Sequence, residues 1–371
     1  MTKVDDAERA AELAALRDAV RDLAGGAGGV GAARRQFEAA PGHDEQAWQS
    51  LGTEMGLAGL GIPEQLGGAG GGLAELTVVA EELGRSLLPV PFFSSTVVSG
   101  QLLTRCPATP AGIVADLASG SSLVAFAGVD ADGCWRPDRT PVRAVHRDGW
   151  ELDGTADFVL DGASAEHLLV AASGPDGCDL YLVAGDAAGV QRRALETLDA
   201  SRSQASVVFT NAPATPLTTG GHGAAIVAAA LDIALVVLAA EQVGGAAACL
   251  DMAVDYAKVR TQFSRPIGSF QAIKHTLAEL LVLVEMGRSA IDRALLAEGD
   301  PATLADAASV AKVWCSEAFS AAATANVHIN GGTGFTWEHD AHLYFRRSRA
   351  DQVLLGDATV HRERLAALHA W

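Results

Sequence analysis

The spacing of apolar residues changes twice along this chain, and this change limits the folds that it can adopt. Up to about residue 120, apolar residues recur every three to four positions, as at Leu13, Leu16 and Val20, which is the spacing of amphipathic helices. Over 121–215 the period falls to two, and short alternating runs are separated by Gly, Asp and Pro. Helical spacing then returns over 216–371. The order predicts an N-terminal helical domain (1–120), a central antiparallel β domain (121–215) and a C-terminal helical domain (216–371).

Charge and cysteine content limit the partners and the compartment. The chain has 27 Lys and Arg residues against 45 Asp and Glu, a net charge of −18, and both nucleic acid and an anionic membrane surface would repel it. We therefore expect neither as a partner. The five cysteines are scattered and show no metal-binding spacing, which favours a reduced, cytoplasmic protein without a metal site. The charged N-terminus lacks the apolar segment of a signal peptide.

The most apolar run of the chain is Ala224–Ala240, AAIVAAALDIALVVLAA. It is shorter than the roughly 20 residues that a membrane-spanning helix needs, and Asp232 interrupts it. The run therefore predicts a helix buried in the core of the protein.

One stretch of the C-terminal domain, VRTQFSRPIGSFQAIKHTLAEL, spans Val259–Leu280. It predicts a helix that ends near Arg260, a turn at 265–268 and a second helix that begins near Ser269. A guanidinium beside a helix N-terminus offers positive charge and free backbone N–H groups to a phosphate. A solvated basic turn would have the same sequence, so the residues alone leave both interpretations open.

Another stretch, HINGGTGFTWEHDAHLYFRRS, spans His328–Ser348. Its paired glycines, Gly331-Gly332, would let a ligand approach the backbone closely, but a Gly-rich connection between helices has the same pattern. The acids and histidines of Trp337–His342 are interpreted as structural or interfacial rather than as metal ligands. Arg346-Arg347 would meet a phosphate or lie at a solvated helix end.

Together with Ile62–Gly72 (IPEQLGGAGGG) and Glu81–Pro91 (EELGRSLLPVP), and in this order, the two stretches resemble the acyl-CoA dehydrogenase family. The resemblance covers essentially the whole chain. It implies a mostly α fold with a β domain: an N-terminal helical domain, a central antiparallel β domain and a C-terminal four-helix bundle. It also implies a tetramer with FAD between subunits, in which a carboxylate removes the α proton of an acyl-CoA thioester and the flavin takes the β hydride.

The resemblance gives this chain the half of a flavin site that a subunit lends to its neighbour. The family's arginine that contacts the FAD pyrophosphate corresponds to Arg260, and Phe263 is the matching aromatic, with Ser264 where glycine is usual. His328 replaces the glutamine that precedes the paired glycines. The implied cofactor-binding residues are Arg260, Gln262, Phe263, Gln271, His328, Gly331 and Gly332.

The half that would hold the chain's own flavin departs from the family. The flavin-binding loop reads AFAGVDADGC over Ala125–Cys134, without the family's Thr-Glu-Pro start or its serine. Leu160 replaces a threonine whose hydroxyl bonds the flavin ring, and leucine has no donor. The two positions of the family's catalytic glutamate hold Gly356 and Ala234, which cannot accept a proton. Asp357, beside the first position, is the plausible substitute.

These departures predict a subunit of a flavin-dependent acyl-CoA dehydrogenase, in an α2β2 assembly with a homologous chain that supplies the glutamate. The resemblance to actinobacterial enzymes that degrade steroid side chains implies a bulky acyl-CoA substrate, and electron-transfer flavoprotein as an acceptor. Two alternatives stay open. One is a self-sufficient homotetramer with Asp357 as the base, and the other is a flavin-free scaffold or regulatory subunit.

Overall fold

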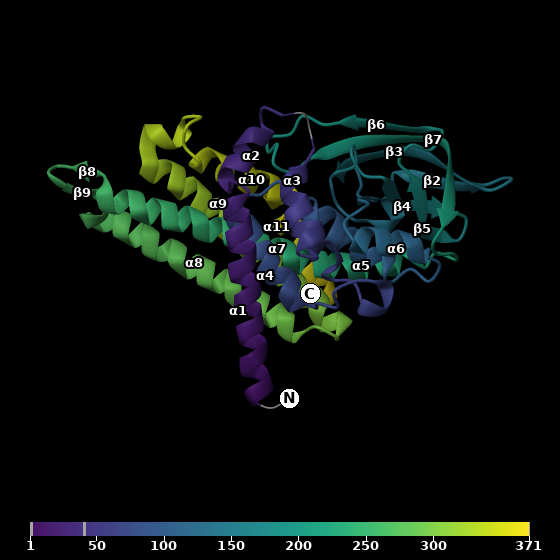
Figure 1. Cartoon of the computed structure of the whole chain (residues 1–371), viewed down its shortest axis with the longest axis horizontal. Coiled ribbons are helices and arrows are strands. Elements are labelled where there is room, and N and C mark those ends of the chain that lie inside the picture. The colour runs from purple at the N-terminus through teal and green to yellow at the C-terminus, as the bar shows by residue number, and fades with distance from the viewer. Residues whose placement is uncertain (1–2, 40–41, 371) are drawn as a thin grey trace.

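The computed structural model describes residues 3–39 and 42–370, and Figure 1 shows helices on one side and a β domain on the other. The N-terminal part is helical, as the spacing of three to four predicts. Its helices are α1 (Lys3–Gly26), α2 (Val30–Gln36), α3 (Glu45–Trp48), α4 (Leu73–Ser86), α5 (Gly100–Leu103) and α6 (Ala111–Ala118), joined by the π-helical turns η1 (Gln49–Glu54) and η4 (Phe92–Ser99) and the 3₁₀ turns η2 (Leu57–Gly59) and η3 (Glu64–Leu66).

The middle of the chain forms a seven-stranded sheet whose pairings close into a ring. Its strands are β1 (Val124–Ala127), β2 (Val142–His146), β3 (Trp150–Leu160), β4 (His167–Gly174), β5 (Gly177–Ala184), β6 (Val190–Ala194) and β7 (Gln204–Pro216), with the 3₁₀ turn η5 (Pro137–Arg139) before β2. Consecutive pairings join β2, β3, β7, β5 and β4, and β4 returns to β2.

The sheet is mixed rather than wholly antiparallel. β4 pairs in parallel with both β1 and β2, while the other pairings are antiparallel. The expectation of an antiparallel domain was therefore wrong for these two pairs. Parallel neighbours need a long crossover connection, and alternation along a single strand carries no signal about the direction of its neighbour.

The C-terminal part consists of long helices. They are α7 (Gly223–Val259), α8 (Gln271–Leu296), α9 (Pro301–Asn330), α10 (Ala341–Val353) and α11 (Ala358–Leu368), with a small hairpin of β8 (Thr261–Gln262) and β9 (Arg265–Pro266) and the 3₁₀ turns η6 (Ile267–Ser269) and η7 (Gly331–Phe335). Within the described chain, α7 is the one helix long and apolar enough to cross a membrane, and 67% of its most apolar window is buried inside the protein.

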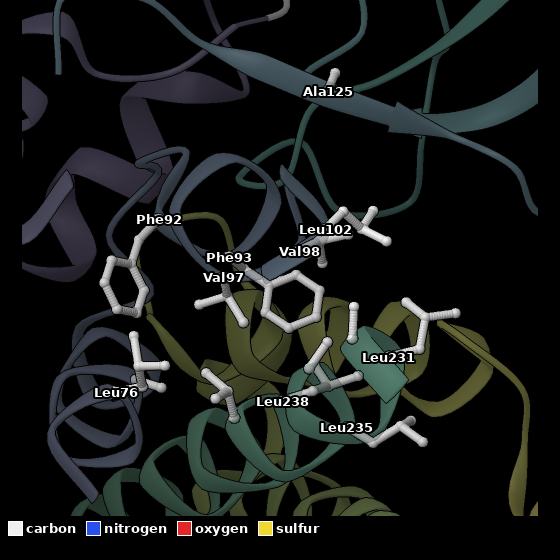
Figure 2. Packing of buried hydrophobic residues seen from close by; sticks show 14 of the residues in the cluster. Leu76, Phe92, Phe93, Val97, Val98, Leu102, Ala125, Leu231, Leu235 and Leu238 are labelled. Atoms are coloured by element: carbon white, nitrogen blue, oxygen red, sulfur yellow. The ribbon is translucent and has the colours of Figure 1, made fainter. Parts of the chain in front are cut away.

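The three parts meet along α7. Phe93 and Val97 of η4 and Leu235 of α7 are at most 6% exposed, and Figure 2 shows them packed together with Leu231 and Leu238. Burying each such side chain stabilises the fold by about 1.5–3 kcal/mol. The N-terminal part therefore packs against the apolar run of α7.

Two glycines allow α4 to lie directly against α7. A Cβ atom at Gly84 would lie 2.0 Å from the carbonyl oxygen of Glu241, and one at Gly244 would lie 1.9 Å from that of Glu81. Side chains at these positions would push the helices apart. The glycine of the EELGRSLLPVP stretch is thus explained by close packing between helices.

Candidate functional site

A basic hairpin lies at the far end of the helical bundle, away from the sheet (Figure 1). It connects α7 and α8, and its two turn residues, Phe263 and Ser264, have φ of 51° and 60°. Phe263 is 87% exposed. Its ring makes an edge-to-face contact with Phe270 (6.1 Å), and the Arg265 guanidinium lies 4.1 Å from the centre of the Phe270 ring. The hairpin therefore presents an aromatic side chain on a positively charged base.

The Arg260 guanidinium is available to bind a partner. Its backbone N–H is bonded to Tyr256, but its exposed side chain has no hydrogen bond or ion pair within the described residues. Residues 256–278 contain four Lys or Arg residues and no Asp or Glu. No side chain caps the start of α8, so its first backbone N–H groups are free to bind an anion. Gln262 and Gln271, on the hairpin and at the first position of α8, are also exposed.

The paired glycines end α9 in an open position. His328 is exposed in the last turn of α9, and its carbonyl accepts the N–H of Gly331. Gly331 has φ of 62°, which disfavours any residue with a side chain. A Cβ atom at Gly331 or Gly332 would have no atom within 4 Å. The backbone here is accessible to another molecule, as the sequence predicts.

A mostly apolar cavity lies where the β domain meets η4 and the end of α10. We call it the apolar cavity. Its volume is about 120 Å³. Its lining includes Phe93, Val98, Phe126, Phe158, Leu160 and Leu355. Asp132 is the carboxylate among its lining residues, and its side chain is 66% exposed and paired with Arg136 at 2.8 Å. Sequence reasoning did not single out Asp132 or this cavity.

A buried charge cluster lies beside the apolar cavity. Arg347 of α10 is 4% exposed, bonds Asp199 and Glu241 at 2.5 Å each, and donates to Ser201 Oγ at 2.7 Å. Arg202 forms a second ion pair with Glu241. Arg347 is therefore a structural residue, and the interpretation of Arg346-Arg347 as a phosphate contact or a solvated helix end is wrong for Arg347.

A buried lysine anchors the end of α10. Lys312 of α9 is 1% exposed, and its Nζ donates to the carbonyl of Asp351 at 2.6 Å and to Ser316 Oγ at 3.0 Å. Gln242 donates to the same Asp351 carbonyl at 3.1 Å. Burial lowers the pKa of Lys312 to about 8. These bonds hold the turn that leads from α10 to Gly356.

Comparison with known proteins identifies this architecture. The model of the acyl-CoA dehydrogenase N-terminal domain matches residues 10–106, and that of the C-terminal domain matches residues 221–368. The chain belongs to the acyl-CoA dehydrogenase family. It is 35% identical over 340 residues to acyl-CoA dehydrogenase IpdE2 of Mycobacterium tuberculosis, with 92% of each protein covered. The expected family is thus confirmed, and so is the expected fold of helical parts with a central β domain, apart from the two parallel strand pairs of its sheet.

Two solved structures of two-component enzymes are similar to this chain. One is the Tcur3481-Tcur3483 steroid ACAD, with a TM-score of 0.88 and 31% identity over 97% of this chain and 98% of that one. The other is the ChsE4-ChsE5 complex from Mycobacterium tuberculosis, with a TM-score of 0.87 and 28% identity over 96% of this chain and 97% of that one.

FAD is the cofactor of the acyl-CoA dehydrogenase family. In the loop that would bind this chain's own FAD, backbone N–H groups make hydrogen bonds within the loop itself. The Asp130 carboxylate accepts the N–H groups of Asp132 (2.9 Å) and Cys134 (3.0 Å), and the Asp130 carbonyl accepts that of Gly133 (2.9 Å). Arg136 pairs with Asp130 and Asp132. These backbone donors are therefore not free for a flavin or its pyrophosphate, and the residues present do not fit a flavin held in cis.

The two residues that the resemblance assigns to the position of the family's catalytic glutamate, Gly356 and Ala234, carry no carboxyl group. Gly356 is buried with φ of 100°, and Ala234 is fully buried in α7. Asp357 is exposed and caps α11, because its Oδ1 accepts the N–H groups of Thr359 (2.9 Å) and Val360 (3.0 Å). It does not belong to the residues that line the apolar cavity. The Asp357 carboxylate thus has a structural role as the N-cap of α11.

Proposed function

We propose that this chain is the non-catalytic subunit of a cytoplasmic, heteromeric acyl-CoA dehydrogenase. In an α2β2 assembly it lends Arg260, Phe263 and the Gly331-Gly332 backbone to FAD that lies mainly on a homologous partner. The partner supplies the glutamate that removes the α proton. When bound, FAD would accept the β hydride of the substrate. This chain would contribute by holding the phosphates of the cofactor.

One contrast carries the proposal. Hydrogen-bond donors have no partner in the described chain where a neighbour's FAD would lie, whereas the donors of the loop that would bind the chain's own FAD are already bonded within that loop. The Arg260 guanidinium is exposed and unpaired within the described chain, beside the uncapped start of α8. In the loop near residue 130, the N–H groups of Asp132, Gly133 and Cys134 are bonded within the loop. A subunit that kept only the lent half of a flavin site would have this pattern.

Similar proteins support the heteromeric assembly and the substrate class. Both the Tcur3481-Tcur3483 steroid ACAD and the ChsE4-ChsE5 complex pair two different chains. We extend this to the present chain and propose a bulky, polycyclic acyl-CoA as the substrate of the assembly, with electron-transfer flavoprotein as the acceptor.

Co-expression with a homologous chain tests the proposal. The chain purified alone should contain little FAD, and the complex should contain one FAD per pair of unlike chains, measured by absorbance of the flavin released on denaturation. Stoichiometric FAD in a homo-oligomer of this chain would contradict the proposal and favour the self-sufficient homotetramer. A stable complex in which FAD is absent would favour the scaffold.

The role of Arg260 has its own test. A charge-assisted bond to phosphate contributes about 1.5–3 kcal/mol, so Arg260→Ala should weaken FAD binding by the complex about ten- to a hundred-fold. Arg260→Lys should recover part of this loss, because an ammonium lacks the planar fork of a guanidinium. Arg143→Ala, at an exposed arginine of the β domain, is the matched control. Equal FAD dissociation constants for Arg260→Ala and the wild type would refute the role.

A further inference from the structure

Asp351, in the last turn of α10, carries a fully buried carboxyl group. The residue is 0% exposed, and neither Oδ1 nor Oδ2 has a hydrogen-bond partner among the described residues. Buried carboxylates are normally paired or hydrogen-bonded, because an ion that leaves water without such partners loses its hydration and gains nothing in return. The lack of partners on both oxygens therefore bears on the charge that this group carries.

Lys312 lies beside Asp351 but bonds the backbone rather than the carboxyl group. Its Nζ donates to the carbonyl oxygens of Asp351 (2.6 Å) and Gln352 (3.4 Å) and to Ser316 Oγ (3.0 Å). An ammonium group has three hydrogens, so Lys312 has none left for the Asp351 side chain. Gln242 also donates to the Asp351 carbonyl, at 3.1 Å. The backbone of Asp351 is thus held from two helices, while its carboxyl group is not bonded.

The two buried arginines of the cluster are engaged with other carboxylates. Arg347 bonds Asp199 through Nε and Glu241 through Nη1. Nη2 of Arg202 bonds Glu241 and lies 3.8 Å from Asp351 Oδ1, which is beyond hydrogen-bond distance. Nη1 of Arg202 has no partner in the described chain, so this guanidinium does not bond Asp351 either. A negative charge on Asp351 would therefore lie close to Glu241, which already takes both guanidinium groups.

This geometry favours a neutral carboxyl group. Burial, opposed by Arg202 and reinforced by Glu241, raises the pKa of Asp351 to about 6. We propose that Asp351 is a proton latch at the end of α10: its neutral form keeps residues 350–356 closed on Lys312 and Gln242, and its ionisation loosens this segment. The latch does not rest on the proposed flavin role, because it shares no residue with the hairpin or the paired glycines. The charged groups that face Asp351 are Arg347 on α10, Glu241 on α7, Lys312 on α9, and Asp199 and Arg202 before β7.

Hydrogen exchange of backbone amides tests the latch on the full chain. When the segment opens, the carboxyl group regains its ordinary pKa of about 3.9. A group whose pKa is raised in the closed form contributes stability at low pH and loses it as the pH rises through that pKa. After correction for the intrinsic exchange rate, the protection of residues 350–356 in the wild type should therefore fall about tenfold between pH 5 and pH 7.5. The amides of α8 in the same chain are the internal reference and should change less.

The chosen pH range isolates Asp351 from its titratable neighbours. It lies above the pKa of His361, which burial lowers to about 4, and below that of Lys312, which burial lowers to about 8. His361 therefore stays neutral and Lys312 stays mostly charged at both pH values.

An asparagine variant assigns the effect to Asp351. Asp351→Asn has nearly the same shape without an ionisable group, so the protection of 350–356 should no longer depend on pH. Asp292→Asn, the same change at an exposed acid of α8, is the matched control and should behave as the wild type does. Wild-type protection that is independent of pH, or an equal pH dependence in Asp351→Asn, would overturn the inference. If Asp351→Asn does not fold, the wild type decides alone, and an equal loss of protection in 350–356 and in α8 would refute the latch.

Discussion

Replacement of Arg347 by methionine should strongly destabilise the protein. The side chain is 4% exposed and bonds two carboxylates, those of Asp199 and Glu241. Methionine keeps much of the volume and removes the charge. Glu241 retains Arg202 as a partner. Asp199 is 1% exposed, and among the described residues its carboxylate retains only the hydroxyl and backbone N–H of Ser201.

The magnitude follows from the carboxylate that is left behind. A buried charge without its partner costs about 3–5 kcal/mol, and we expect a loss of this size in the free energy of unfolding at pH 7.5. Burial alone would raise the pKa of Asp199, but Arg347 and Ser201 outweigh burial and hold it below its usual value.

Without Arg347, burial dominates and the folded pKa of Asp199 should rise above its unfolded value of about 3.9. A group whose folded pKa is raised contributes stability at low pH and loses it as the pH rises through that pKa. The Arg347→Met loss should therefore be smaller at pH 5 than at pH 7.5.

Urea unfolding followed by circular dichroism measures this loss at the two pH values. Arg346→Met is the matched control, because Arg346 is only half-buried and lies against the rings of Phe37 and Trp337 at 5.3 and 5.5 Å. It should cost about 1 kcal/mol or less. Adding Asp199→Asn to Arg347→Met should recover part of the stability. A loss no larger than that of the control, or one independent of pH, would refute the reasoning.

Three further predictions concern the turn between α10 and α11 and the first turn of α11. Asp357→Asn should change the free energy of unfolding by no more than about 0.5 kcal/mol, because asparagine also caps helices. The activity of the complex should stay within a few-fold of the wild type. A drop in activity of about 10²–10⁴-fold would make Asp357 the base. Gly356→Glu should lower the free energy of unfolding by about 1–3 kcal/mol, because φ at this position is 100° and a Cβ atom would lie 3.1 Å from the Val360 side chain. The variant should not raise activity, and a gain in activity would contradict this prediction. Burial, with a smaller contribution from Lys312, lowers the pKa of His361 to about 4. The free energy of unfolding of the wild type, relative to that of His361→Leu, should therefore decrease as the pH falls from 6.5 to 4. A difference that does not depend on pH would contradict this.

Local patterns predicted much of this molecule. The change of period from helical to two and back gave the order of helical and β parts, and the apolar run at Ala224–Ala240 gave the buried helix α7. α7 ends beside Arg260 and α9 ends beside Gly331, as the sequence predicted, but the chain turns at Phe263-Ser264 in a β-hairpin rather than at 265–268. Such features depend on residues within a few positions of one another, so the sequence alone determines them.

Other features depended on tertiary structure. Arg346 and Arg347 are neighbours in sequence, yet successive residues of a helix point about 100° apart, and one lies half-exposed while the other is buried. Asp199 and Arg347 are 148 positions apart, and only the packing of α10 against the β domain brings them together. The parallel pairings of β4 likewise depend on the crossovers that bring β1 and β2 beside it.

The role of Asp357 shows the same division. The resemblance puts Asp357 beside one expected position of the base, and in the fold its carboxylate accepts the N–H groups of Thr359 and Val360 at the start of α11. Periodicity determines which face of an element is buried, because that depends on local backbone geometry alone. Which charges pair, which donors stay free and which cavities remain depends on contacts between segments far apart in the chain, and these form only when the elements pack.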